Sequence, residues 1–153
     1  MRKSFRGRIV CGAYMCTLTS MNQQSKYWTG AHTKHRLQYH LVFIPKYRHR
    51  VLQGKVAERL EVLLHQACEM NRWEIHEFSI QPDHVHLLLQ ASPSKSVAHI
   101  VQILKWGTSR VLRQEFPEIQ EFLWGDSFWS DGYFSETVGV HQEEMIRKYI
   151  QDQ

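Results

Sequence analysis

Residues 82–89 read Pro-Asp-His-Val-His-Leu-Leu-Leu, an apolar run that holds two histidines two positions apart. On a β-strand, side chains two positions apart point to the same face. His84 and His86 should therefore project side by side, while Val85 and Leu87 enter the core. Pro-Asp before the pair is typical of a turn that opens a strand, so the pair should lie at an accessible strand end. Two imidazoles on a rigid strand supply two ligands of a metal site.

The segments around this run predict an α+β fold. Residues 73–80 form the strand before it, and the turn at 81–83 makes the two strands a hairpin. Apolar residues at helical spacing and Pro117 delimit two helices. The expected elements, in chain order, are strand 37–44, a helix opened by Gly54, strands 73–80 and 84–90, a helix capped by Ser94 or Ser96 and ending near 116, strands 127–130 and 133–138, and a helix over 141–153.

This order is βαββαβ with an extra strand and a C-terminal helix. It predicts a ferredoxin-like antiparallel sheet with helices on one face. The chain has 153 residues and is 42% hydrophobic, enough for one domain with its own core. We expect residues 34–153 to form that domain and residues 1–33 to be a flexible N-terminal extension. Met21 is an alternative start, since the recognisable pattern begins after it.

Composition excludes several classes of protein. The three cysteines form no CxxC pair, which argues against a disulfide framework or a zinc knuckle and favours a reducing cytoplasm. Basic residues precede a short apolar stretch at 9–16, but the stretch lacks the length and the cleavage site of a signal peptide. No apolar run has the length of a membrane span, so we expect no membrane partner.

The C-terminal helix carries a second group of candidate residues. Tyr149 and Gln153 are four apart and therefore share a helical face. A tyrosine late in an amphipathic helix usually packs in a core or at its rim, and a lone His-x-His pair is usually incidental, so the prediction depends on their combination. His84, His86 and the amide oxygen of Gln153 would make a neutral ligand set for Mn²⁺ or Mg²⁺.

Such a site suits attack by tyrosine on a phosphodiester. A phenol has a pKa of about 10 and is a poor nucleophile at neutral pH. A metal that polarises a phosphate oxygen and neutralises the developing charge makes the attack possible. The product is a covalent phosphotyrosine, which keeps the energy of the phosphodiester bond and allows rejoining without ATP. Tyr149 is thus the candidate nucleophile.

The net charge of +4 permits a polyanionic partner without requiring one. Solvated charge is the ordinary explanation of any single basic cluster. Aromatic residues among the charges, such as Tyr47, favour phosphate contacts and base stacking. The candidate DNA-binding residues are Lys34, Arg36, Lys46, Arg48, Arg50, Lys105 and Arg110.

Together these motifs resemble the single-tyrosine HUH transposases of the insertion-sequence 200/605 type. The resemblance rests on His-hydrophobic-His after Pro-Asp, with Tyr149 followed four residues later by Gln153. It covers about residues 32 to 153, although members of the family usually continue somewhat further. Other matching segments are residues 32–34, 39–43, 45–48, 104–105, 109–110, 116–117, 129–130, 132–134 and 138–139.

The resemblance implies a metal-dependent enzyme that cuts and rejoins single-stranded DNA at insertion-sequence ends. Such proteins are homodimers that recognise subterminal hairpins, and their tyrosine becomes joined to a 5′ phosphate. By position, Tyr149 is the nucleophile, and His84, His86 and Gln153 are the ligands of Mg²⁺ or Mn²⁺. In family members the tyrosine helix of one subunit can complete the active site of the other. Tyr133 lies outside the motif.

Two alternatives remain open from the sequence. One is a non-catalytic nucleic-acid-binding module on the same fold, although such sheets use exposed aromatic residues on central strands and the histidines occupy those positions here. The other is a host-domesticated relative that nicks DNA without mobilising an element. The sequence does not separate the second alternative from a transposase.

Overall fold

The computed structural model describes residues 27–123 and 127–153 of the chain, so most of the predicted N-terminal extension lies outside the described residues. A two-stranded ribbon and a 3₁₀ turn accompany the main elements. The elements are β1 (Trp28–Thr29), β2 (Lys34–His35), β3 (Leu37–Phe43), η1 (Lys46–Arg48), α1 (Lys55–Met70), β4 (Glu74–Gln81), β5 (His84–Ala91), α2 (Val97–Glu115), α3 (Ile119–Leu123), β6 (Phe134–Val138) and α4 (Glu143–Gln151).

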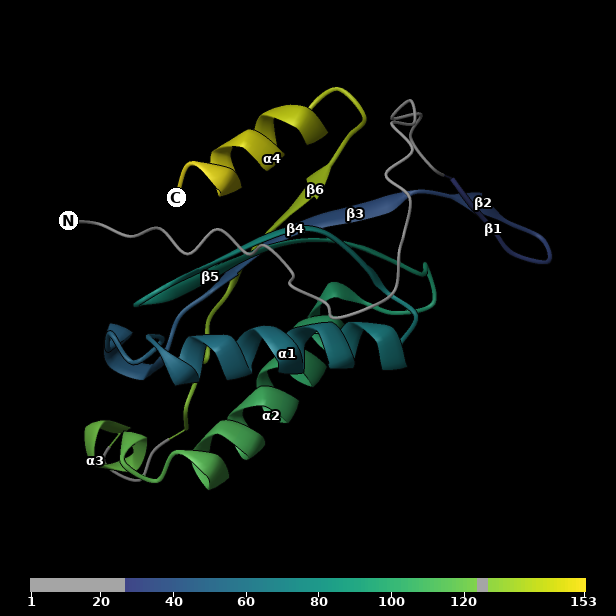
Figure 1. The fold of residues 1–153 in the computed structure, drawn as a ribbon. Coiled ribbons are helices and arrows are strands. Elements are labelled where there is room, and N and C mark those ends of the chain that lie inside the picture. The colour runs from purple at the N-terminus through teal and green to yellow at the C-terminus, as the bar shows by residue number, and fades with distance from the viewer. Residues whose placement is uncertain (1–26, 124–126) are drawn as a thin grey trace, which may run out of the picture.

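The main sheet has four antiparallel strands in the order β4-β5-β3-β6. The predicted α+β fold with the βαββαβ order is therefore confirmed. Helices α1 and α2 cover one face of the sheet, and α4 lies on the opposite face (Figure 1). Ser96 is the N-cap of α2, because its side chain accepts a hydrogen bond from the backbone N–H of His99.

The alternation of side chains divides the sheet between two environments. On the α1/α2 side, apolar residues of β3 and β5 are fully buried, including Leu41, Leu87 and Leu89. On the α4 side a smaller apolar cluster forms, in which Leu88, Val138 and Ile150 are buried. Polar side chains from β3 and β5 are buried on the sheet as well: Gln38, His40, His86 and Gln90. Polar groups in such positions need partners, and those partners define the site.

Residues 127–130 differ from the prediction. Residues 127–130 are not a strand: Trp129 makes a single bridge with Pro45. Trp129 is 3% exposed, packs edge-on against Phe43 and donates a hydrogen bond from Nε1 to Oγ1 of Thr108. This segment therefore fills the core with side chains instead of adding backbone to the sheet. The short helix α3 precedes this segment in the chain.

Among residues 27–123 and 127–153, no helix combines the length and the apolar character that a membrane crossing requires.

Candidate active site

The two histidines of the Pro-Asp-His-Val-His run share the sheet face that α4 covers. Val85 and Leu87, between and after them, are fully buried in the core on the other side. The ring centroids of His84 and His86 lie 5.0 Å apart, with the rings nearly perpendicular. His86 is 5% exposed, whereas the side chain of His84, at the strand end, is 19% exposed. The two histidine side chains thus lie on the same face of the sheet, as predicted.

A third histidine, from β3, joins the pair. His40 Nε2 lies 3.1 Å from His86 Nδ1, and the two rings are almost parallel, with centroids 5.3 Å apart. One ring nitrogen must donate a proton to the other. The remaining nitrogen of His40, Nδ1, is buried without a hydrogen-bond partner and lies 4.0 Å from a carboxylate oxygen of Glu136. The sequence analysis missed His40, whose only signal is its place in strand alternation.

Asp83 orients the outer histidine. Its Oδ1 lies 2.7 Å from His84 Nδ1, and its Oδ2 accepts a hydrogen bond from Arg48 Nε at 3.0 Å. Burial raises the pKa of Asp83, but the hydrogen bonds from His84 and Arg48 outweigh burial, so the pKa is lowered overall. The carboxylate is therefore charged at neutral pH. The sequence analysis treated Asp83 only as a turn residue, although its place beside His84 was a signal.

Burial keeps the inner histidines neutral. The pKa of His86 is lowered to about 4, chiefly by burial and further by the charges of His84 and His40. The pKa of His40 is also lowered by burial, although Glu136 acts in the opposite direction. A neutral imidazole is the form that binds a metal ion.

Tyr149 of α4 closes this group of histidines. Its ring centroid lies 5.5 Å from that of His86 and 6.2 Å from that of His40, in edge-on contacts. The tyrosine is 48% exposed, so its ring is open to a ligand. An open pocket of about 430 Å³ lies here, lined by His40, Val42, His86, Phe134, Glu136, Ile146 and Tyr149.

The histidine pair fits a divalent cation. A metal-bound histidine usually engages its other ring nitrogen with a carboxylate or a similar partner. Nδ1 of His84 contacts Asp83, and Nδ1 of His86 contacts His40. Nε2 of each ring is therefore the atom that could bind the metal ion. Gln153 lies beyond the end of α4, is exposed and does not line the pocket. Among residues 27–123 and 127–153, no group of three or more His, Cys, Asp or Glu side chains is arranged to hold a metal ion.

A family model described as "Transposase IS200 like" matches residues 33–153. The chain belongs to the IS200-like transposase family. It is 38% identical over 119 residues to the ISDra2 transposase TnpA of Deinococcus radiodurans, a match that covers 78% of this chain and 85% of that protein. It is 33% identical over 123 residues to the transposase for insertion sequence element IS200 of Salmonella typhimurium, covering 80% of each chain.

The chain is also similar to solved structures, two of which follow. The crystal structure of a putative transposase from Deinococcus radiodurans R1 has a TM-score of 0.69 and 34% identity, covering 82% of this chain and 97% of that one. A REP-associated tyrosine transposase bound to a REP hairpin has a TM-score of 0.57 and 11% identity, covering 85% of this chain and 70% of that one. The second likeness is one of fold alone.

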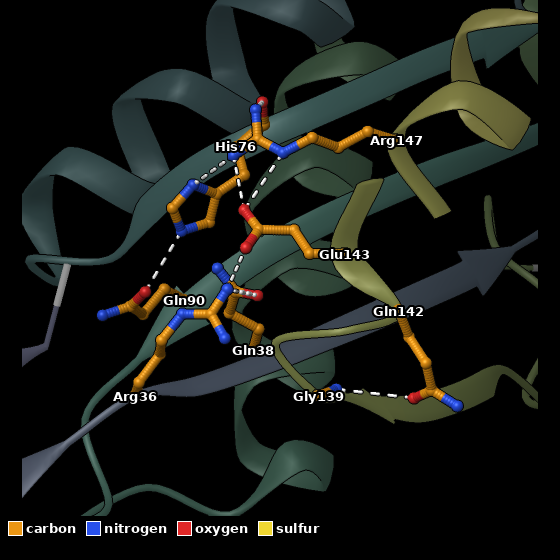
Figure 2. Close-up of polar contacts among 8 residues, drawn as sticks. All are labelled: Arg36, Gln38, His76, Gln90, Gly139, Gln142, Glu143 and Arg147. Carbon is orange, nitrogen blue, oxygen red and sulfur yellow. Dashed lines mark hydrogen bonds and ion pairs between the residues drawn. The ribbon is translucent and has the colours of Figure 1, made fainter. Parts of the chain in front are cut away.

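Arg36, one of the predicted DNA-binding residues, has a structural role. The side chain of Arg36 is only 4% exposed and forms an ion pair with Glu143 of α4 and a hydrogen bond with Gln38 (Figure 2). Its guanidinium is therefore not available to a phosphate in this structure. The sequence shows a basic cluster beside Lys34 but not the acidic partner of Arg36, which lies 107 residues further along the chain.

The other predicted DNA-binding residues make contacts that engage their charges to different degrees. Lys105 donates hydrogen bonds to the carbonyls of Ser130, Asp131 and Gly132, and burial lowers its pKa although Asp131 raises it. Lys105 thus links α2 to the segment 130–132 that precedes β6. The remaining candidates keep contacts that leave their charge near the surface: Lys34 with the Tyr27 ring, Lys46 with Asp131, Arg48 with Asp83, Arg110 with the Trp106 ring, and the exposed Arg50.

Proposed function

We propose that this protein cleaves and rejoins single-stranded DNA at the ends of an insertion sequence, with Tyr149 as the nucleophile. The observation that carries the proposal is the placement of Tyr149 beside His86 in one open pocket. The two residues lie far apart in the sequence, on β5 and α4. Family membership supports a transposase, and the pocket supplies a nucleophile for it.

In the proposed step the phenol oxygen of Tyr149 attacks a DNA phosphorus. The bond from that phosphorus to the 3′ oxygen breaks, and the phenolic proton ends on the leaving 3′ oxygen. The 5′ phosphate stays attached to the tyrosine. Attack by the 3′ hydroxyl of another strand reverses these changes and releases Tyr149, so no ATP is consumed.

We further propose that His84 and His86 hold Mg²⁺ or Mn²⁺ through Nε2. Gln153 is our proposed third ligand, and it would have to move toward the histidines to bind, because in this structure it is exposed and does not line the pocket. Bound there, the cation would polarise a phosphate oxygen and neutralise charge that develops in the transition state. Asp83 and His40 would fix the two imidazoles in the orientation that binding needs. Glu136 adds a carboxylate to the pocket wall near His40.

The surface supports a DNA partner in two places. In the turn that follows β3, Tyr47 is 62% exposed beside Lys46. On the face of the sheet opposite α4, Trp106 of α2 is 66% exposed with the guanidinium of Arg110 over its ring. Exposed aromatic rings with adjacent cations suit stacked bases and phosphates. The hairpin-bound relative of the same fold supports our proposal that the DNA carries subterminal hairpins.

We also propose that the protein works as a homodimer in the cytoplasm. Strand β6 is at the edge of the sheet, and four of its five residues are exposed, which leaves this edge available to a second copy. Sedimentation tests this proposal: a dimer at micromolar concentration is expected, and a monomer both with and without DNA contradicts it.

The experiment for the catalytic proposal is incubation with labelled single-stranded element ends. With Mn²⁺ or Mg²⁺ we expect a denaturation-resistant protein–DNA adduct, and chelation should abolish it. DNA binding without any adduct in either metal would instead support the non-catalytic alternative.

A further inference from the structure

The face of α4 that meets the sheet has three rows of side chains. The middle row is apolar, with Ile150 buried and Ile146 partly buried in the cluster that contains Leu88 and Val138. On one side of this seam lies Tyr149. On the other side, Glu143, Arg147 and Gln151 follow one another at a spacing of four residues, which places them along one edge of the helix.

Each residue of this polar row binds the sheet. Glu143 pairs with Arg36, which the chain carries just before β3. Arg147 donates to Glu143 at 2.7 Å and to Nδ1 of His76, on β4, at 3.0 Å. Gln151 donates from Nε2 to a carboxylate oxygen of Glu77 at 2.7 Å. Figure 2 shows the first two contacts converging on the Glu143 carboxylate.

The network continues into the buried polar layer of the sheet. His76 Nε2 lies 3.2 Å from Oε1 of Gln90, which is 1% exposed. A neutral His76 with its proton on Nε2 donates to Gln90 and accepts from Arg147 at the same time. Burial and the charge of Arg147 both lower the pKa of His76 and so favour this neutral form, while Gln90 acts in the opposite direction. The contacts with Gln90 and Arg147 therefore favour one tautomer of His76 and one orientation of its ring.

We propose that Glu143 and Arg147, with their sheet partners Arg36 and His76, are positioning residues for the tyrosine. We call these four residues the polar clamp. The apolar seam is narrow, and apolar contact is non-directional, so the seam alone does not fix the rotation of α4 about its axis. Charge-assisted hydrogen bonds are directional. The clamp fixes that rotation from the edge opposite Tyr149 and thereby holds the tyrosine in the pocket.

This inference rests on Tyr149 as the nucleophile. A turn of the helix by one residue position is about 100° and would carry the phenol away from the histidines. Small misplacements of a reacting group are costly, because catalysis depends on near-attack geometry. The clamp residues should thus affect the reaction step without touching the DNA.

The test uses Glu143→Gln and, because the partner Arg36 is buried, Arg147→Gln as a milder second variant. Glu144→Gln is the matched control, since Glu144 is exposed on the same helical turn. Three quantities are measured: DNA affinity, the rate of adduct formation at saturating DNA, and the ¹⁹F signal of Tyr149 in fluorotyrosine-labelled protein. That signal is assigned by its loss in Tyr149→Phe.

We expect both clamp variants to keep their DNA affinity and to form the adduct at least about tenfold more slowly. Their Tyr149 signal should shift or broaden, whereas Glu144→Gln should match the unmodified protein in all three. An unmoved Tyr149 signal together with an unchanged adduct rate overturns the proposal. If the unmodified protein forms no adduct, the catalytic proposal fails. The polar clamp is then tested by the ¹⁹F signal alone, and an unmoved Tyr149 signal in the clamp variants overturns the clamp proposal.

Discussion

His40 Nε2 lies 3.1 Å from His86 Nδ1, so a histidine of β3 holds the ring of a candidate metal ligand of β5. The two rings are nearly parallel, and both residues are about 95% buried or more. A partner in this position fixes the orientation of the His86 ring, and metal binding through Nε2 of His86 requires its Nδ1–H to donate to His40. The candidate metal site therefore depends on a residue that is not itself a candidate ligand.

Replacing His40 should weaken metal binding. His40→Leu removes the partner of His86 Nδ1, and loss of such a partner typically lowers metal affinity about 10- to 100-fold. Mn²⁺ binding, followed by electron paramagnetic resonance without DNA, measures the change. His141→Gln, at an exposed position, is the control. Equal Mn²⁺ affinity of His40→Leu and the unmodified protein would show that His40 does not support the site.

Asp83→Asn should also lower the metal affinity of this site, because Asp83 contacts the other candidate ligand, His84. The carboxylate at 2.7 Å from His84 Nδ1 also accepts from Arg48, and an amide offers one oxygen in place of two. We expect lower Mn²⁺ affinity with little change in the thermal midpoint, because the surface ion pair with Arg48 contributes at most about 1 kcal/mol. A large loss of stability with unaltered Mn²⁺ affinity would show that Asp83 stabilises the turn and does not support metal binding.

The basic residues after β3 should contribute phosphate contacts. In the triple variant Lys46→Gln, Arg48→Gln, Arg50→Gln, each lost contact should lower the salt slope of log K by about 0.7 for single-stranded DNA. Lys105→Gln is the comparison, because its ammonium holds three backbone carbonyls and its loss should lower stability instead. An unaltered salt slope in the triple variant would reduce this cluster to solvated charge.

His76 should make the docking of α4 sensitive to acid. Its pKa is lowered in the folded state, first by burial and also by Arg147 and Arg36, against opposing effects of Gln90 and Glu74. The unfolded chain therefore binds a proton first as pH falls, and stability is lost below the unfolded pKa of about 6.5. At about pH 5.5 one such group accounts for up to about 1.4 kcal/mol.

The comparison that isolates this effect is His76→Gln. Denaturant unfolding at about pH 7.5 and about pH 5.5 gives the loss of stability on acidification for each protein. His86 and His40 also have lowered pKa values and remain in both proteins, so only the difference between the two losses reports on His76. We expect the smaller loss in His76→Gln, and equal losses would contradict the assignment.

Alternation in the sequence was enough to predict which residues share a face. It placed His84 and His86 together and directed Val85 and Leu87 to the core, because the period of a strand is a local property. It could not identify His40 as the partner of His86, 46 residues away, because strand neighbours follow from sheet order and register.

Arg36 and Trp129 show the same limit. Arg36 belongs to a basic cluster in the sequence, but the fold buries it against Glu143. Trp129 lies in a segment rich in strand-forming residues, yet its ring fills the core beside Phe43 and its backbone makes only a bridge. For both residues, the role depends on a tertiary contact that the local sequence does not reveal.

The central claim is that Tyr149 becomes covalently joined to DNA, and peptide mass spectrometry tests it most directly. Cleavage after Lys148 releases residues 149–153 as a peptide that contains one tyrosine. After reaction with single-stranded element ends and nuclease digestion, we predict that this peptide carries a 5′-linked nucleotide on Tyr149. Tyr149→Phe should show no adduct, while the matched control Tyr133→Phe should keep it. A nucleotide on another residue, or an adduct that persists in Tyr149→Phe, would contradict the account.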